Sequence, residues 1–310
     1  NYIARHRNMA EARLAVGESV LLSDLLCIEK EKSDGTIKRR LLVNLKTSGA
    51  TAASKKTERV LLPRSLDVVY DLLEMLAVCP GDRGMELLVL DFIDAFWQLP
   101  IRPDERAFLA FEYEGEIYVF SRLAQGSRGA PLCWARLAAL ITRLTQAMFE
   151  DDVFRISTYV DDPIMAIFGS AAERERIRAI VVLFWLCLDL PLAFPKAKLG
   201  GIDHPLTWTS ATFQINPDTV TARVKDEIVA AVQETLREWS TGNVISLRDL
   251  RQFLGRANCI ADLFPTWRPF LAMMYGPLSL TAELGNAPKG CVFRTQIRVP
   301  RRWLTALFAD

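Results

Sequence analysis

Two adjacent aspartates, Asp161 and Asp162, interrupt an apolar part of the chain. Residues 156–160 before them and residues 164–168 after them are rich in β-branched and other apolar side chains. Runs of this kind on both sides of a short polar pair predict two antiparallel strands joined by a tight turn. The fold must therefore place two carboxylates together at the tip of a hairpin.

Two further strand patterns lie upstream of this hairpin. Residues 86–90 form an apolar run that ends directly before Asp91. Residues 108–111 and 117–120 are apolar runs on either side of a turn-like Glu-Gly pair, which predicts a second hairpin. The sequence therefore predicts enough strands for more than one antiparallel pair.

An amphipathic helix is predicted after each hairpin. Pro131 is a helix-initiating residue, and apolar residues then recur at helical spacing. These residues are Leu137, Leu140, Ile141, Leu144 and Met148. Ser170 with Glu173 forms a capping-box pattern that opens a second helix, whose apolar run at 179–188 is expected to be buried.

From about residue 217 the pattern is helical. One apolar stripe consists of Ile228, Val232, Leu236 and Trp239, and another consists of Leu247, Leu250, Leu254 and Ala257. Ser246 with Asp249 is a cap pattern before the second stripe. At 310 residues the chain should contain two or more subdomains of mixed α/β (α+β) class.

Composition excludes several kinds of chemistry. The only histidines are His6 and His204. Two distant histidines argue against a catalytic triad that contains histidine and against a histidine-rich zinc site. The six cysteines are Cys27, Cys79, Cys133, Cys187, Cys259 and Cys291. Because no pair has the close spacing of zinc or redox motifs, they are expected to be reduced core residues.

No secretory signal opens the chain, and the apolar run at 179–188 is about half the length that a membrane span needs. We therefore expect an intracellular protein without a membrane partner, with cytoplasm and nucleus both open.

The net charge of +1 conceals a basic N-terminal segment. Residues 1–64 contain 13 Lys or Arg against 7 Asp or Glu. Such a run is either a solvated surface or a binding surface for a polyanion.

A third acid extends the acidic pair. Asp91 follows the strand predicted at 86–90, and three converging carboxylates are the oxygen ligands that hard divalent cations prefer. The Asp-Asp pair alone would be an ordinary polar turn. With Asp91, the acids predict a site for two Mg²⁺ ions, with Mn²⁺ as an alternative.

Three sequence boxes resemble those of retroelement reverse transcriptases. They are residues 90–101 (LDFIDAFWQLPI), 123–131 (LAQGSRGAP) and 159–162 (YVDD), in the order typical of that family. Residues 250–258 (LRQFLGRAN) resemble the segment after the polymerase core of gypsy-like and DIRS-like retrotransposons. The resemblance covers roughly residues 30–275 and implies an RNA-directed DNA polymerase.

The resemblance assigns the catalytic centre. It implies that Asp91, Asp161 and Asp162 form the metal site, with the backbone carbonyl of Phe92 as a further ligand. It also implies a lysine that protonates the pyrophosphate leaving group. Lys198 is the first choice and Lys196 is its rival, because spacing does not decide between them.

Nucleotide-binding residues follow from the same boxes. Phe96 matches the steric gate that excludes a ribose 2′-hydroxyl, and Asp94 and Ala95 lie beside it. Gln125 and Gly126 would border the incoming nucleotide. For the triphosphate, Arg40 is preferred and Lys32 is second, because a guanidinium can hold two phosphate oxygens.

Template and primer contacts are implied for five residues. These are Arg128, Tyr159, Trp208, Thr209 and Ser210, of which the last three resemble a primer-grip hairpin that lacks its usual glycine.

The implied fold is a right-hand polymerase. Fingers are expected at 18–86 and 107–128, a palm of antiparallel sheet with helices at 87–106 and 129–216, and a helical thumb at 217–280. Residues 281–310 would begin a following region that is truncated here.

The expected partners are an RNA or DNA template with its primer and deoxynucleoside triphosphates, and the oligomeric state stays open. Two alternatives to an active reverse transcriptase also stay open. One is an inactive retroelement remnant that binds nucleic acid, and the other, less favoured, is an RNA-dependent RNA polymerase.

Overall fold

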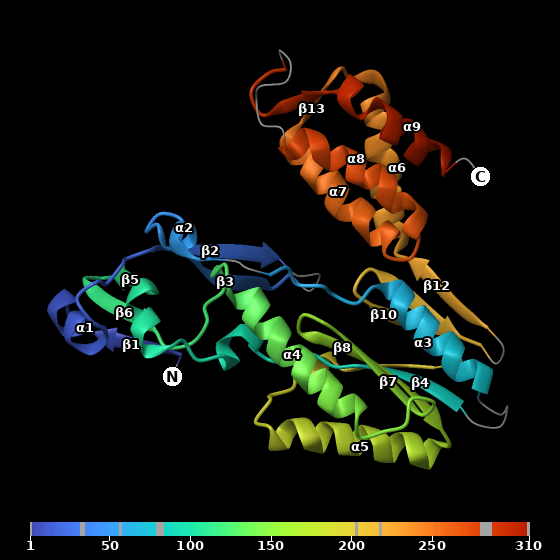
Figure 1. Ribbon diagram of the computed structural model, residues 1–310, viewed down its shortest axis with the longest axis horizontal. Coiled ribbons are helices and arrows are strands. Elements are labelled where there is room, and N and C mark those ends of the chain that lie inside the picture. The colour runs from blue at the N-terminus through green and yellow to red at the C-terminus, as the bar shows by residue number, and fades with distance from the viewer. Residues whose placement is uncertain are drawn as a thin grey trace.

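The computed structural model describes residues 2–31, 35–55, 58–78, 84–201, 204–216, 219–279 and 287–308. Within these ranges the helices are α1 (Met9–Val16), α2 (Ala50–Ala53), α3 (Ser65–Val78), α4 (Ala130–Gln146), α5 (Ala171–Cys187), α6 (Asp226–Thr241), α7 (Leu247–Ala261), α8 (Arg268–Ser279) and α9 (Arg298–Ala306). The strands are β1 (Ile3–His6), β2 (Asp24–Glu31), β3 (Ile37–Asn44), β4 (Gly84–Val89), β5 (Ala110–Tyr113), β6 (Glu116–Phe120), β7 (Phe154–Tyr159), β8 (Asp162–Gly169), β9 (Lys198–Gly200), β10 (Leu206–Trp208), β11 (Ala211–Ile215), β12 (Val220–Val224), β13 (Val244–Ser246) and β14 (Cys291–Phe293). The fold is mixed α and β, as the sequence predicts (Figure 1).

A four-stranded sheet with the order β7-β8-β4-β9 lies at the centre, and all its neighbouring strands are antiparallel. Both faces of this sheet are covered. Leu88 and Leu90 pack with α4 and α5 on one face, whereas Leu87 and Val89 pack with α3 on the other. Burial on both faces explains why the second half of β4, residues 87–89, is continuously apolar rather than alternating.

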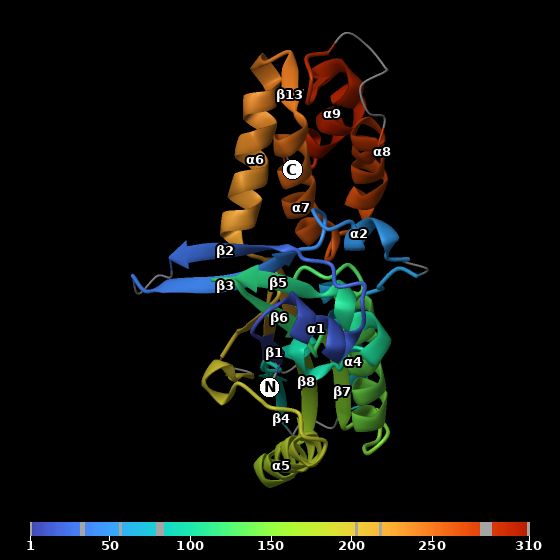
Figure 2. The ribbon, with the colours of Figure 1, turned by 90° about the vertical axis from the view of Figure 1, so that its left-hand side faces the viewer.

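The N-terminal part forms a separate three-stranded sheet, β1-β6-β5, and the hairpin of β2 and β3. β5 and β6 are joined at Glu114 and Gly115, which have φ angles of 52° and 79° and form the turn that the sequence predicts. Figure 2 shows β2 and β3 projecting to one side of the molecule.

The C-terminal helices α6 to α9 form a bundle above the sheet β10-β11-β12 (Figure 1). Val232 of α6 and Leu250 of α7 belong to the same core cluster as Val89 of β4. The bundle and the central sheet therefore share one hydrophobic core.

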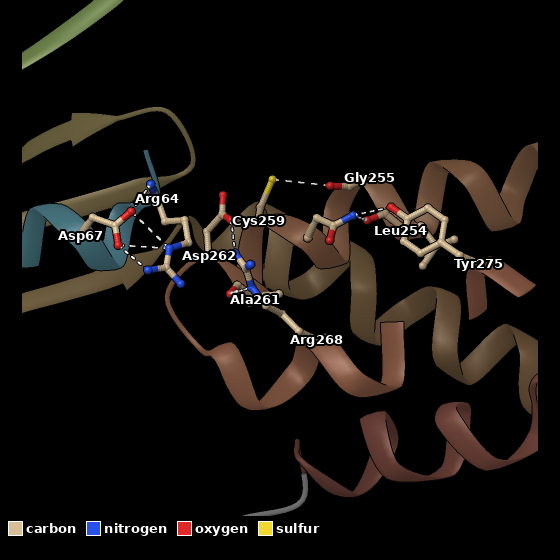
Figure 3. A network of polar contacts seen from close by, with 10 residues as sticks. Arg64, Asp67, Leu254, Gly255, Cys259, Ala261, Asp262, Arg268 and Tyr275 are labelled. Atoms are coloured by element: carbon tan, nitrogen blue, oxygen red, sulfur yellow. Dashed lines mark hydrogen bonds and ion pairs between the residues drawn. The ribbon is translucent and has the colours of Figure 1, made fainter. Parts of the chain in front are cut away.

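A polar network joins α3 to the bundle (Figure 3). The Leu66 N–H donates to the Asp262 carbonyl at 3.2 Å. Arg64 pairs with Asp67, and Arg268 pairs with Asp262 at 3.4 Å. Burial raises the pKa of Asp262, while Arg268 and Arg64 act against this rise. At this junction the positive charges of Arg64 and Arg268 therefore offset the negative charges of Asp67 and Asp262.

The amphipathic helix predicted after Pro131 is confirmed as α4; its buried face includes Trp134, Ala138, Ile141 and Thr145, whereas Leu140 and Leu144 are exposed. Two expectations about burial are wrong. The run at 179–188 exposes Leu183 and Leu186, because α5 is an outer layer over one face of the sheet. The five cysteines within the described ranges carry no disulfide, but each is exposed or only partly buried rather than in the core, and Cys79 lies outside these ranges.

None of the described helices combines the length and the apolarity that crossing a lipid bilayer requires.

The capping box at the start of α5 is confirmed. The Glu173 N–H donates to the Ser170 hydroxyl at 3.3 Å, and the Ser170 N–H donates to the Glu173 carboxylate at 2.7 Å.

Ser170→Ala should lower the free energy of unfolding by about 1 kcal/mol, because it leaves one helix N–H unpaired. Urea denaturation measures this change. The exposed Glu175→Ala in the same helix should change stability by less than about 0.5 kcal/mol, and equal losses would contradict the role of the cap.

Candidate active site

The two adjacent acids lie at a tight turn, as predicted. β7 and β8 pair with Tyr159 opposite Asp162, so Val160 and Asp161 form the turn. Val160 has φ of 57°, a left-handed conformation that is rare for a β-branched residue. Glycine is usual where only the first central residue of a hairpin turn has positive φ. The backbone is therefore strained directly before Asp161.

Main-chain hydrogen bonds bring the third acid to this turn. The Leu90 N–H donates to the Pro163 carbonyl at 3.2 Å, and the Phe92 N–H donates to the Asp161 carbonyl at 3.0 Å. Asp91 lies between these two donors and is 9% exposed. The end of β4 thus extends along the turn and places Asp91 beside the acidic pair.

The charges of the three carboxylates act on one another. Burial raises the pKa of Asp162 to about 6, and the charges of Asp161 and Asp91 add to this rise. Burial also raises the pKa of Asp161; Asp91 adds to the rise, whereas Lys196 and Arg40 oppose it. The carboxylates repel one another, and the positive charges of Lys196 and of Arg40 on β3 partly offset this repulsion at Asp161.

A cleft of about 320 Å³ opens beside the acids. It is lined by Val89, Asp91, Asp162, Pro195, Lys196, Ala197, Lys198, Thr207, Trp208 and Thr209. Both lysines that the sequence leaves open therefore lie in one cleft. Lys196 forms an ion pair with the Asp91 carboxylate, whereas the Lys198 ammonium donates to the Thr207 carbonyl at 3.3 Å.

The donor chemistry suits a hard divalent cation. The charge of Asp91 contributes to the raised pKa of both Asp161 and Asp162, so a shared positive ion would stabilise this group of carboxylates. In the described ranges, however, no group of three or more His, Cys, Asp or Glu side chains has the arrangement of a metal site. The Lys196 ammonium occupies one oxygen of Asp91, so a cation bound there would have to displace it.

The residues around the predicted gate follow the end of β4 directly. A short 3₁₀ helix, Ala95–Gln98, carries Phe96, which is half-buried against the core on the α4 side. Asp94 is exposed with φ of 52°. Ala95 is buried.

The glutamine-glycine segment packs on β3. The Val43 N–H donates to the Gln125 carbonyl at 3.2 Å. Gly126 has φ of 105°, and a Cβ added there would lie 2.4 Å from the Val43 carbonyl oxygen. The close approach that requires glycine is thus to β3. The exposed Arg128 donates to the Ser54 carbonyl at 3.0 Å.

Arg40 and Lys32 were the candidates for the triphosphate. Arg40 lies exposed on β3 opposite Ile28, and its charge acts on Asp161. Lys32 lies outside the described residues.

Two of the residues predicted to contact a primer are buried. Trp208 is 1% exposed, and its indole N–H donates to the Asp162 carbonyl at 2.9 Å. Ser210 is also buried, and its carbonyl accepts the Lys225 N–H at 3.1 Å. Their contact with a primer stays a prediction. Thr209, between them, is partly exposed with φ of 49°.

Sequence reasoning missed Trp134. This residue is fully buried, and its indole N–H donates to the Val160 carbonyl at 2.6 Å. A buried tryptophan usually finds an acceptor for its N–H. The presence of Trp134 in the predicted amphipathic helix therefore indicated a buried N–H that needs an acceptor, but not which acceptor. Tyr159 is half-buried, and its ring meets Trp208 edge-on.

No protein-family model matches the chain. Among solved structures it resembles a foamy viral protease-reverse transcriptase in complex with double-stranded DNA, with a TM-score of 0.53 and 16% identity over 97% of this chain and 48% of that chain. A foamy viral protease-reverse transcriptase in complex with an RNA/DNA hybrid gives a TM-score of 0.48 and 17% identity over 92% of this chain and 34% of that chain. The first likeness shows a reverse-transcriptase polymerase fold. The chain spans about half the length of that structure.

The raised pKa of Asp162 makes stability depend on pH. Because this pKa is about 6 in the folded protein and 3.8 in the reference state, folding favours the protonated carboxyl. Stability should therefore fall as pH rises from about 4 to about 6, where the native state must accept the charge. Asp162→Asn, which removes that charge, should raise the melting temperature at pH 7 but not at pH 4.

Thermal unfolding in EDTA measures this difference. A gain of equal size at both pH values would show that the charge of Asp162 is not the cause.

Proposed function

We propose that this chain is the polymerase core of a reverse transcriptase, which extends a primer with deoxynucleotides on an RNA or DNA template. The observation that carries the proposal is the convergence of three acids. Main-chain bonds from Leu90 and Phe92 hold Asp91 against the turn of Asp161 and Asp162, and the charges of these acids act on one another. The polymerase fold supports the same conclusion.

The proposed parts of the hand correspond to elements of the fold. The central sheet with α3, α4 and α5 would be the palm, and the helices α6 to α9 would be the thumb and the start of the following region. The projecting β2–β3 hairpin and the sheet β1-β6-β5 would be the fingers. A retrotransposon origin rests on the likeness of residues 250–258 alone.

In the proposed reaction the primer 3′-oxygen attacks the α-phosphorus of the incoming nucleotide, and the bond to the pyrophosphate oxygen breaks. Asp91, Asp161, Asp162 and the Phe92 carbonyl would hold two Mg²⁺ or Mn²⁺ ions. These ions would lower the pKa of the attacking hydroxyl and stabilise the developing negative charge.

Cationic side chains of this chain would handle the triphosphate. Arg40 acts electrostatically on Asp161 and is exposed, so its guanidinium can hold phosphate oxygens beside the acids. Lys198 would donate a proton to the departing pyrophosphate. Lys196 is the alternative donor, since both ammonium groups line the same cleft.

One observation favours a second function, an inactive remnant that binds nucleic acid. Lys196 already neutralises Asp91, and no three-ligand group stands assembled among the described residues. A fold of this kind could keep its nucleic-acid surface after losing the ability to bind cations productively.

Primer extension separates the two functions. With Mg²⁺, the chain should extend a DNA primer on RNA, and Asp161→Asn should lower the rate by at least about 100-fold, the cost of misplacing a reacting group by about 1 Å. Asp104→Asn, a surface acid paired with Arg102, should leave the rate unchanged. Duplex binding without extension by the unsubstituted chain would instead support the remnant.

Phe96 should select against ribonucleotides. Phe96→Val opens space beside the sugar, so the preference for deoxynucleotides over ribonucleotides should fall by about 10-fold or more. Steady-state incorporation of each nucleotide on one template measures this ratio. Phe108→Val, at an exposed phenylalanine outside the cleft, should leave the ratio unchanged. A constant ratio in Phe96→Val would refute the gate.

A further inference from the structure

The turn that carries the acids is strained yet well defined. Val160 has φ of 57°, which costs a β-branched residue free energy that glycine would not lose. Such a conformation persists only where the surroundings over-determine it, and these positions cluster at functional sites. The groups that hold Val160 in place are therefore candidates for a role in positioning Asp161.

Two buried indoles bond to the carbonyls on either side of Asp161. The Trp134 N–H donates to the Val160 carbonyl at 2.6 Å, and the Trp208 N–H donates to the Asp162 carbonyl at 2.9 Å. Trp134 is 0% exposed and Trp208 is 1% exposed. An indole N–H is only a donor, so its loss would leave a carbonyl without that partner.

The two indoles reach the turn from opposite faces of the central sheet. Trp134 extends from α4 and belongs to the core on the side of α4 and α5. Trp208 extends from β10 and belongs to the core on the side of α3. Asp161 is thus held between one bond from each face, and these bonds restrain the backbone on both sides of it.

We propose that Trp134 and Trp208 are paired positioning residues that clamp the strained turn and set the orientation of the Asp161 carboxylate. The proposal rests on the proposed polymerase function for its consequence in catalysis. The clamp itself is a property of the turn and can be measured without any reaction.

Trp185 offers a matched comparison within the same core. It is also 0% exposed, and its indole N–H donates to the Thr145 hydroxyl at 2.8 Å rather than to the turn. If buried indole bonds mattered only for stability, all three tryptophans would behave alike. If Trp134 and Trp208 act as a clamp, they differ from Trp185.

The test replaces each tryptophan in turn by benzothienylalanine, which keeps the bicyclic shape and exchanges the N–H for sulfur. Three quantities are measured on the full chain. They are the melting temperature, the hydrogen exchange of the peptide spanning residues 159–163, and kcat with the deoxynucleotide KM in primer extension.

For positions 134 and 208 we expect faster exchange in this peptide and a kcat reduced about tenfold, equivalent to about 1.4 kcal/mol. The KM should change less than twofold. At position 185 the exchange and kcat should match the unsubstituted chain, although the melting temperature falls equally. Equal exchange and equal kcat at all three positions would overturn the clamp.

A second variant isolates the strain at Val160. Val160→Gly adopts positive φ without cost, so the analogue at 134 should accelerate exchange less in that background. Strict additivity of the two changes would also overturn the proposal. If exchange separates the positions but the unsubstituted chain extends no primer, the clamp stands and the proposed polymerase function fails.

Discussion

Four successive carbonyl groups, those of residues 160–163, each accept a hydrogen bond, and the placement of the acids depends on these bonds. Two donors are the backbone N–H groups of Leu90 and Phe92, and two are the indoles of Trp134 and Trp208. Residues 160–162 are partly buried and Pro163 is buried, so these donors stabilise the turn by satisfying its carbonyls. The central sheet, α4 and β10 thereby meet at one segment of backbone.

Charge is the second constraint on this centre. Burial, and after it the charges of the neighbouring acids, disfavour the ionised forms of Asp161 and Asp162 and raise their pKa. Lys196 reduces the repulsion through its ion pair with Asp91. An acid with a raised pKa in a cleft, as Asp162 is, is a candidate for a functional residue. The centre is thus an arrangement whose cost is relieved by any cation that reaches it, whether an ammonium or a metal ion.

Much of this architecture could be predicted from the sequence, because strand periodicity, turn residues and caps are local signals. The strands around Asp161, the hairpin at Glu114 and the cap at Ser170 all follow such signals and lie where they were expected. Partners distant in the chain could not be predicted. The spacing of Trp134 says nothing of its acceptor, and the resemblance to a primer grip gave no sign that Trp208 is buried.

The contact of the glutamine-glycine segment with β3 has a mechanical consequence. The Val43 N–H donates to the Gln125 carbonyl, and the Val43 carbonyl leaves no room for a side chain at Gly126. The glutamine-glycine segment therefore packs directly on the β2–β3 hairpin. Arg40 stands on the same hairpin, three residues before Val43. Any movement of the hairpin relative to the acids would therefore also displace the backbone of Gln125, so the positions of Arg40 and Gln125 are coupled.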